Sequence, residues 1–418
     1  MSCSLKPLQC AGLAILLFLA VLNGCKQRRL TDPTTQMNIE QQFWVRVLLF
    51  DNIKDCSLKM DSPFSVTNQH TQIEQVHFDR FDTPVRINLD AGRISFAGWG
   101  CDGNEITIKP DKPYVFNING SDYRGNLTLI LNHDSNSFGA VNLVPIDPYL
   151  AGVIGAEMPG YWESAALQAQ AIAARSYCLY IKKRFGRNRH WDVRRTQANQ
   201  VYDGLAVESA QIWDTVNSTS GQVLTCREPN EKWNIFPAYY SSACGGHTEN
   251  SQNVFGPDKS GVTTLTGVPC PYCRKVARQN FFSWPTVQME KSFITKRLQN
   301  RYPSLNVLGN IEKIIPTQSK YKDFSRLTSV KLVGSTGKTG FLIAEDFRLA
   351  IDPTGLKIKS ACFEIVDMND KWALESGRGF GHGVGLCQCG AQAQAREGKT
   401  AVQILRYYYP NSKIEKIY

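Results

Sequence analysis

The chain has 418 residues, of which 42% are hydrophobic and 11% aromatic, and its net charge is +10. This composition excludes a disordered protein, and the length suffices for two or three ordinary domains or for one elaborated domain. The basic residues are scattered, which weakly favours an anionic partner such as a cell-wall polymer or a membrane surface. The sequence has no zinc-finger array, no aromatic RNA-binding signature and no P-loop, so we expect no nucleic acid partner.

The N-terminus has the features of an exported protein. An apolar run at 11–22 is short for a membrane span but suits the core of a signal peptide. The ending Asn23-Gly24-Cys25 resembles the processing site of bacterial lipoproteins, in which the cysteine becomes the lipidated first residue. An uncleaved membrane anchor is the alternative. We predict a lipoprotein-like signal peptide at 1–25, which would place the rest of the chain in the cell envelope, tethered to the membrane.

Residues 26–42 are polar and are predicted to form a tether, and residues 43–120 are rich in short β-type runs. Turn residues at 102–103 (Asp-Gly) and 119–120 (Asn-Gly) separate several of these runs. The predicted strands, which continue to the middle of the chain, cover residues 44–50, 85–89, 93–96, 105–109, 127–131 and 139–144. We therefore expect a β-rich N-terminal region that leads into the core.

An alanine-rich helix is predicted at residues 163–185. Pro159 suits its first turn, and Gly186 suits its end. Its apolar positions recur at helical spacing and its alanines allow close packing, so we expect it to be buried on most sides. The periodic positions are Leu167, Ala171, Ala174, Cys178 and Ile181.

Glu157 lies between an apolar, strand-like run at 149–156 and this predicted helix. A lone carboxylate at such a junction is either a structural charge stabilised by backbone amides or a catalytic acid. Position alone favours the structural role.

The second half of the chain alternates between short strands and helices. Strands are predicted at 212–224, 235–240, 327–333, 339–344 and 362–366. Helices are predicted at 286–301, at 391–396, and from a capping box at Thr400 and Gln403 to the residues before Pro410. Together these elements predict an α+β fold, with a mixed β-sheet core around the buried helix.

The strongest chemical pattern is a pair of two-residue gaps, Cys244-x-x-His247 and Cys270-x-x-Cys273. Such a gap lets both side chains reach one tetrahedral ion, so the spacing predicts a structural Cys3His zinc site that clips the intervening loop. A disulfide between Cys270 and Cys273, or free thiols, are the alternatives. The remaining cysteines have no regular spacing and leave room for one or two disulfides.

A glycine-rich segment at 377–385 contains His382. Its glycine spacing matches a dinucleotide-binding pattern, but no strand-turn-helix with a downstream acid accompanies it. We interpret the glycines as letting the backbone lie close to an extended ligand. His382 is then either a packed residue or one presented to that ligand from a tight loop.

In these segments the sequence resembles the stage II sporulation protein D and amidase-enhancer family of bacterial cell-wall proteins. The matching segments occur in the same order over residues 120–410. They are 123–125 (Tyr-Arg-Gly), 142–159 (ending Gly-Ala-Glu-Met-Pro), 165–177 (ending Ala-Ala-Arg-Ser-Tyr), 199–204 (Asn-Gln-Val-Tyr-Asp-Gly), 238–249 (containing Cys-Gly-Gly-His) and 377–391 (containing Gly-His-Gly-Val-Gly).

The resemblance implies a lytic transglycosylase that cuts the glycan strands of peptidoglycan and leaves 1,6-anhydro-muramyl ends. It implies that Glu157 is the catalytic acid and then the base, and that Arg175, Tyr240 and His382 contact the substrate. Such an acid needs a raised pKa, which burial against Tyr161, Trp162 or Tyr240 would supply. The N-terminus of the following helix would oppose this, because it stabilises the anion.

The same resemblance places the family core at 121–418, after the predicted signal peptide at 1–25, the tether at 26–42 and the β-rich region at 43–120. It also leaves a second function open, namely a non-catalytic cell-wall-binding protein that enhances an N-acetylmuramoyl-L-alanine amidase. Two departures from the family are visible. Many relatives have a histidine at the position of Ser241, and relatives often have a serine at that of Cys387.

Overall fold

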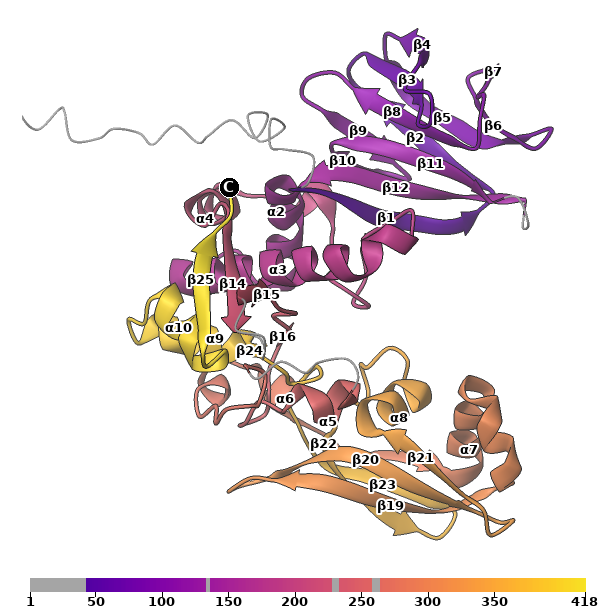
Figure 1. Ribbon diagram of the computed structural model, residues 1–418. Helices are drawn as coiled ribbons and strands as arrows, with labels where there is room; N and C mark the ends of the chain where they lie inside the picture. The colour runs from indigo at the N-terminus through magenta and orange to yellow at the C-terminus, as the bar shows by residue number, and fades with distance from the viewer. Residues whose placement is uncertain (1–42, 133–135, 228–232, 258–263) are drawn as a thin grey trace, which may run out of the picture.

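The computed structural model describes residues 43–132, 136–227, 233–257 and 264–418. The predicted signal peptide at 1–25 and tether at 26–42 lie outside these residues. In Figure 1 the N-terminal sheets, a central group of helices and a third, largely β module follow one another through the molecule. Among the described residues, no helix is both long and apolar enough to cross a membrane.

Two sheets form the N-terminal part. The seven-stranded sheet has the order β13-β1-β12-β11-β8-β3-β4 and the six-stranded sheet the order β10-β9-β2-β5-β6-β7. Their strands are β1 (Trp44–Ile53), β2 (Asp55–Met60), β3 (Phe64–Asn68), β4 (Glu74–Phe78), β5 (Phe81–Asp90), β6 (Arg93–Phe96), β7 (Trp99–Gly100), β8 (Glu105–Pro110), β9 (Val115–Ile118), β10 (Ser121–Arg124), β11 (Asn126–Asn132), β12 (Ser137–Pro145) and β13 (Val193–Arg194). The prediction of a β-rich N-terminal part is confirmed.

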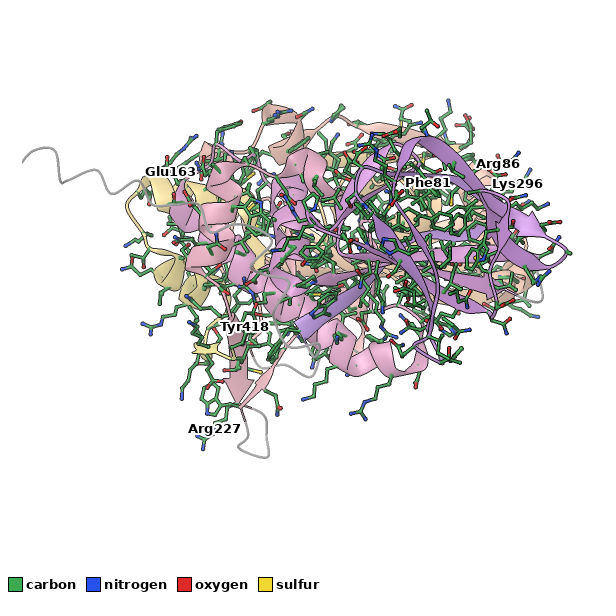
Figure 2. All side chains as sticks on the ribbon, turned by 90° about the horizontal axis from the view of Figure 1, so that it is seen from above. Phe81, Arg86, Glu163, Arg227, Lys296 and Tyr418 are labelled. Atoms are coloured by element: carbon green, nitrogen blue, oxygen red, sulfur yellow. The ribbon has the colours of Figure 1, made fainter. Side chains whose placement is uncertain are left out.

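The inner faces of the two sheets pack against each other. Phe64 on β3 lies 5.0 Å, between ring centroids, from Phe81 on β5 of the other sheet. Side chains fill the space around Phe81 when the molecule is seen from above (Figure 2). The buried residues of both sheets belong to the same hydrophobic cluster as the central helices, so the N-terminal part shares its core with the rest.

The chain then forms α2 (Ile146–Glu157), in place of the predicted strand at 149–156. The run is apolar on all sides, and a short apolar run does not distinguish a strand from a buried helix. Met158 is extended and precedes Pro159, and a residue before proline disfavours the helical conformation. Glu157 is therefore the last residue of a helix.

The predicted central helix is confirmed as α3 (Ser164–Phe185). Fourteen of its side chains are buried, among them Leu167, Ala171, Ala174 and Cys178. It lies between the N-terminal sheets and the C-terminal helices in Figure 1, and it contacts α2, α4, α9 and α10. This burial on most sides is what the alanine-rich sequence predicts.

The remaining central elements pack around α3. They are η3 (Gly186–Asn188), η4 (Gly204–Val207), α4 (Ala210–Ser218), β14 (Gln222–Arg227), β15 (Trp233–Ile235), β16 (Tyr240–Ser241), α5 (Ser251–Phe255), η6 (Cys273–Lys275), α6 (Gln279–Phe282), β24 (Leu386–Cys387), α9 (Gln388–Arg396), α10 (Ala401–Tyr408) and β25 (Ser412–Lys416). The predicted strand at 212–224 is wrong over its first half, because Ser209 caps a helix there and Ile212, Trp213 and Val216 are buried at helical spacing. The capping box at Thr400 is confirmed.

A third module is inserted between α6 and β24 and has a hydrophobic core of its own. Its elements are β17 (Ser283–Trp284), β18 (Val287–Glu290), α7 (Lys291–Arg301), η7 (Pro303–Leu308), β19 (Ile311–Lys320), β20 (Ser325–Gly334), β21 (Thr339–Ile343), α8 (Ala344–Ile351), β22 (Cys362–Met368) and β23 (Lys371–Arg378). The predicted helix at 286–301 begins only at Lys291, because the preceding residues pair with β23. The α+β class is confirmed.

Gly155 generates a prediction about packing. A Cβ at this position would lie 2.2 Å from the carbonyl oxygen of Val207, so α2 and η4 touch only because Gly155 has no side chain. We expect Gly155→Ala to lower the free energy of unfolding by about 1–3 kcal/mol, as overpacking does. Gly160→Ala is the matched control, since the nearest atom would lie 3.8 Å away. Chemical denaturation measures both, and equal effects would contradict the packing argument.

Candidate active site and four-cysteine centre

Glu157 stands at the C-terminal end of α2, where a loop from the following segment crosses it. The backbone N–H of Val201 donates a hydrogen bond to Glu157 Oε1 at 2.8 Å. The close approach of α2 to η4 at Gly155 keeps the loop ending at η4 against the helix. The carboxylate is thus held on one side by a fixed backbone donor.

Tyr240 and Gln388 lie on other sides of Glu157, each close enough to lower its pKa. Gln200 connects the tyrosine to the core, because its Nε2 donates to Tyr240 Oη at 3.0 Å and its Oε1 accepts from Tyr149 Oη at 3.0 Å. Nε2 of Gln388 is buried and has no hydrogen-bond partner among the described residues. This amide therefore has a hydrogen-bonding capacity that no described residue uses.

The pKa of Glu157 is raised above its ordinary value, chiefly because burial disfavours the anion. The hydrogen bond from Val201 and the neighbouring side chains of Gln388 and Tyr240 lower the pKa by less than burial raises it, and the nearby carboxylate of Asp203 raises it further. The position at a helix C-terminus acts in the same direction, because that end of the helix carries partial negative charge. The expected opposition from a helix N-terminus is wrong, since Glu157 ends α2 instead of preceding α3 directly.

Tyr161 does not cover this carboxyl. Its side chain is 78% exposed, so it contributes little to the burial that the sequence led us to expect from it. Trp162 is half-buried and packs against the main core. The close aromatic neighbour that acts on the pKa of Glu157 is Tyr240.

A short parallel pairing positions Tyr240 and Gln388 together. β16 pairs with β24 in the register Tyr240 with Leu386 and Ser241 with Cys387. Gln388 begins α9 directly after β24. Two segments almost 150 residues apart in sequence thereby meet beside Glu157.

His382 lies next to the segment that leads into β16, as a packed, neutral residue. Its ring contacts Tyr239 at 5.8 Å and Phe255 at 5.3 Å between centroids. Its Nδ1 accepts a hydrogen bond from the N–H of Val384 at 3.0 Å, which leaves Nε2 as the protonated nitrogen. Burial lowers the pKa of His382 to about 4, so the imidazole carries no charge at neutral pH.

The glycine-rich segment contacts protein where we expected a ligand. Gly385 has a φ of +71°, and a Cβ there would lie 2.1 Å from the carbonyl oxygen of Tyr239. Its glycines let this loop run directly alongside the segment that carries Tyr240. The expected role in approaching an extended ligand is replaced by this internal packing.

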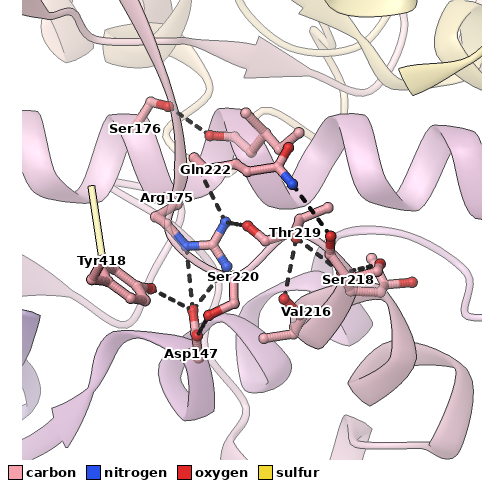
Figure 3. Close-up of polar contacts among 11 residues, drawn as sticks. Asp147, Arg175, Ser176, Val216, Ser218, Thr219, Ser220, Gln222 and Tyr418 are labelled. Carbon is pink, nitrogen blue, oxygen red and sulfur yellow. Dashed lines mark hydrogen bonds and ion pairs between the residues drawn. The ribbon is translucent and has the colours of Figure 1, made fainter. Parts of the chain in front are cut away.

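Arg175 is fully buried, in place of the expected contact with a sugar. Its guanidinium pairs with Asp147 at 2.8 Å and donates to the carbonyl oxygens of Thr219 and Gln222 (Figure 3). Tyr418 Oη donates to the same Asp147 carboxylate at 2.7 Å. With no exposed surface, Arg175 joins α3, α2 and the turn before β14, and its role in this structure is to hold the core together.

Four buried cysteines form a separate centre beside the acid. Cys244, Cys270, Cys273 and Cys387 place their sulfur atoms within 4.8 Å of one another. None of the ten described cysteines forms a disulfide. Burial raises the pKa of the Cys244 and Cys387 thiols, whereas hydrogen bonding with Cys244 and its neighbours lowers that of Cys270.

The donor set fits a metal such as zinc. A tetrahedral ion with zinc–sulfur bonds of about 2.3 Å separates its sulfur ligands by about 3.8 Å. The Sγ atoms of Cys244 and Cys273 lie 3.8 Å apart. The N–H of Cys244 also donates to Cys387 Sγ at 3.3 Å, the kind of outer contact that orients a thiolate ligand. Four soft ligands in a buried site leave no open position for a water nucleophile.

His247 is not part of this centre, and its predicted place is taken by Cys387. Its Nδ1 lies 2.6 Å from the Thr248 carbonyl oxygen, and its ring stacks on Tyr321 at 3.9 Å. The two intervening glycines have positive φ values of +81° and +135°, which turn the chain so that His247 points away from Cys244. Cys244 and His247 therefore have the predicted two-residue gap, but His247 lies outside the cysteine cluster.

The inserted module reaches this region through Arg326 on β20. This arginine is fully buried, and its Nη2 donates to the Cys244 carbonyl oxygen at 2.7 Å. Its Nη1 lies 3.4 Å from the carbonyl oxygen of His382. Arg326 therefore holds the cysteine loop and the glycine-rich loop at the same time.

Several residues of this site have weak sequence signals. Gln200 and Gln388 are ordinary polar residues until the fold places them beside Glu157 and Tyr240. Cys387 had a signal, namely its departure from the serine that relatives often have. To infer that Cys387 takes the place of His247 in the cluster, one must know that β24 pairs with β16.

Comparisons with known proteins agree on one family. Residues 134–226 match the family model described as SpoIID, stage II sporulation protein. An uncharacterized protein of Brachyspira hyodysenteriae (strain ATCC 49526 / WA1) is 30% identical over 294 residues, which cover 70% of this chain and 72% of that protein. Stage II sporulation protein D of Bacillus subtilis (strain 168) is 29% identical over 293 residues, or 66% of this chain and 76% of that protein.

The amidase enhancer of Bacillus subtilis (strain 168) is 24% identical over 372 residues. The match covers 78% of this chain but 49% of the enhancer, so the chain spans about half the length of that relative.

The four-cysteine centre makes a prediction that separates two ligand sets. We expect the purified protein to carry a zinc ion. The Cys387→Ser variant should lose most of this zinc and the His247→Ala variant should retain it, because Cys387 belongs to the cluster and His247 does not. Elemental analysis of protein purified without chelator measures the zinc content. Loss of zinc from His247→Ala with retention in Cys387→Ser would restore the Cys3His set.

Proposed function

Because the chain belongs to the stage II sporulation protein D family, we propose that it is an exported lytic transglycosylase that cuts peptidoglycan glycan strands. The observation that carries this proposal is the Glu157 carboxyl. It has a raised pKa, a backbone donor on one side, and Tyr240 and the partner-free Gln388 amide on others. A carboxyl with a raised pKa, placed among positioned polar groups, is a candidate general acid.

In the first step, protonated Glu157 gives its proton to the glycosidic oxygen as the bond from that oxygen to the anomeric carbon breaks. Burial favours the protonated form that this step needs. Charge then develops on the anomeric carbon, and the newly formed Glu157 carboxylate would stabilise it. The hydrogen bond from Val201 keeps the carboxylate oriented.

In the second step, the 6-hydroxyl of the same muramyl residue attacks the anomeric carbon, and Glu157 takes the hydroxyl proton. The products are a 1,6-anhydro-muramyl end and a new chain end with a free hydroxyl, and no water is consumed. Ordinary glycoside hydrolysis needs a second carboxylate to activate water or to attack the sugar. The ring closure needs only the acid that has just lost its proton.

The other site residues have supporting roles in this proposal. Tyr240, fixed by Gln200, and the free amide of Gln388 would bind sugar hydroxyl or acetamido groups next to the bond that breaks. His382 is neutral, so its role would be hydrogen bonding through Nε2, not electrostatic stabilisation. Zinc held by Cys244, Cys270, Cys273 and Cys387 would be structural and would fix the β16–β24 pairing.

Export is part of the proposal and depends on residues 1–25, which resemble a lipoprotein signal peptide ending at Cys25. A membrane-tethered protein in the cell envelope would reach the glycan strands directly.

Glu157→Gln tests the role of the acid. We expect formation of anhydro-muramyl ends from purified peptidoglycan to fall by about 100- to 10,000-fold, the usual contribution of a general acid. Mass spectrometry of the released fragments measures these ends. Equal product from both proteins would contradict the role of Glu157, and absence of product from the wild type would favour the amidase-enhancing function.

Thermal unfolding at pH 7 is the control for folding of this variant. A raised native pKa means that the native state binds the Glu157 proton more tightly than the unfolded chain does. Its stability therefore falls as pH rises from the ordinary glutamate pKa to the raised value. Glutamine removes this loss, so Glu157→Gln should melt no lower than the wild type.

Asp203→Asn separates ring closure from hydrolysis. Asp203 raises the pKa of Glu157, so its removal should move the alkaline limb of the pH–rate profile to lower pH while the anhydro product persists. Initial rates measured across the pH range, with product analysis, give both readouts. Loss of activity together with reducing ends from the wild type would instead make Asp203 a base for water attack.

A further inference from the structure

A basic surface lies at the C-terminal end of α3, in residues 182–195. It contains Lys183, Arg184, Arg187 and Arg189, all of them exposed. Within the described residues these four side chains form no ion pair with a carboxylate. By contrast, the neighbouring Arg194 lies 3.6 Å from Asp51. The first four charges are therefore available to an anionic partner.

Aromatic rings hold these arginines in place. The guanidinium carbon of Arg189 lies 5.2 Å from the ring centroid of Phe185 and 4.6 Å from that of Trp191. Arg184 lies 5.6 Å from the Phe185 ring, and its Nη1 donates to Tyr180 Oη at 3.1 Å. Stacking occupies the faces of a guanidinium but leaves its N–H edges free for a carboxylate.

The loop beneath these side chains is anchored to the N-terminal sheet. Arg46 on β1 donates from Nη1 to the Arg189 carbonyl oxygen at 2.9 Å and from Nη2 to that of Gly186. It also pairs with buried Asp192 at 2.7 Å. The arginine array thus rests on a fixed backbone, which lowers the entropic cost of binding.

A run of tyrosines connects the array to Glu157. Tyr177 on α3 accepts a hydrogen bond from Asn199 Nδ2 at 3.2 Å, two residues before the Val201 N–H that binds Glu157, and its ring lies 5.6 Å from that of Tyr239. Tyr180 and Arg184 also lie close enough to Tyr239 to affect its pKa. From Tyr177 to Arg184 the helix rises by about 10 Å, at about 1.5 Å per residue. Arg184 therefore lies about two helical turns further along α3 than Tyr177.

We propose that Arg184 and Arg189 form a distal subsite that binds carboxylates carried by the glycan strand. This proposal rests on the proposed function for the identity of the polymer. Guanidinium edges match carboxylates in bidentate geometry, which neutral sugars do not offer. The carboxylates come either from lactyl groups on peptide-free strands or from stem peptides, and binding to each strand type distinguishes the two sources.

The test measures binding, so that it does not depend on cleavage. The Glu157→Gln protein is titrated with peptide-free strands, with strands that retain stem peptides, and with neutral N-acetylglucosamine oligomers of similar length. We expect Arg184→Gln/Arg189→Gln to weaken binding to one or both carboxylated strands about tenfold, with no change for the neutral oligomers. The advantage of the carboxylated strands should also shrink as salt increases.

Lys296→Gln/Arg297→Gln on α7 is the matched control, because it removes the same charge and Arg297 likewise lies over a ring, that of Phe293, at 5.8 Å. Unchanged binding in the Arg184/Arg189 variant, or an equal loss for the neutral oligomers, would overturn the proposal. Anionic phospholipid vesicles are titrated in the same way, and a loss confined to them would overturn the proposal in favour of a membrane contact. Carboxylate-dependent binding by a wild type that cuts no strands would reject the transglycosylase but keep the subsite.

Discussion

The site depends on the pairing of two residues in β16 with two in β24. The register of this pairing is the constraint on the site. Tyr240 lies opposite Leu386 and Ser241 opposite Cys387, so one short ladder positions both the acid site and the cysteine centre. Toward α2, the ladder brings Tyr240 and Gln388 to the Glu157 carboxyl. In the other direction it brings Cys387 to the cysteines of the 244–273 loop. A pairing of only two residues is weak by itself, so the sulfur centre, the glycine-rich loop and Arg326 all contribute to keeping it in register.

Two carboxylates on α2 show how the same helix serves structure and chemistry. Asp147 faces the core, where it receives the guanidinium of Arg175 and the hydroxyls of Ser220 and Tyr418. These partners compensate the cost of burying its charge. Among the described residues Glu157 forms no ion pair, and its polar neighbours are the Val201 N–H and the neutral side chains of Tyr240 and Gln388. One buried carboxylate is therefore paired with a buried guanidinium, whereas burial raises the pKa of the other.

Local patterns predicted part of the secondary structure, and the failures have specific physical causes. The strands β1, β5, β6, β8, β11 and β12, the alanine-rich α3 and the capping box at Thr400 follow from side-chain period and capping chemistry. The run before Glu157 was misjudged because an entirely apolar stretch has no period that separates strand from helix. The missing information in both that case and the one at 212–224 was tertiary burial.

Only part of the candidate site was predictable from the sequence, because tertiary contacts determine where the other residues lie. Glu157, Tyr240 and three of the cysteines stand in patterns that a sequence displays. His247 fits the ligand spacing but is turned away by two glycines with positive φ, and only the backbone shows this. Arg175 stands in a segment that resembles the family. This resemblance alone does not show whether the residue lies in the core or in the active site. Gln200 and Gln388 acquire meaning only from long-range pairing.

The inserted module has its entrance and exit at one place, because β17 pairs with β23 through Ser283 with Arg378 and Trp284 with Gly377. A module attached in this way can change in size without moving the chain on either side of it. Arg326 links this module to the rest of the protein, because it donates a buried hydrogen bond to the carbonyl oxygen of Cys244. A loosening of the module would withdraw that donor and release the cysteine loop. The folding of the module thus influences how firmly the cysteine loop, and with it the β16–β24 pairing, is held in place.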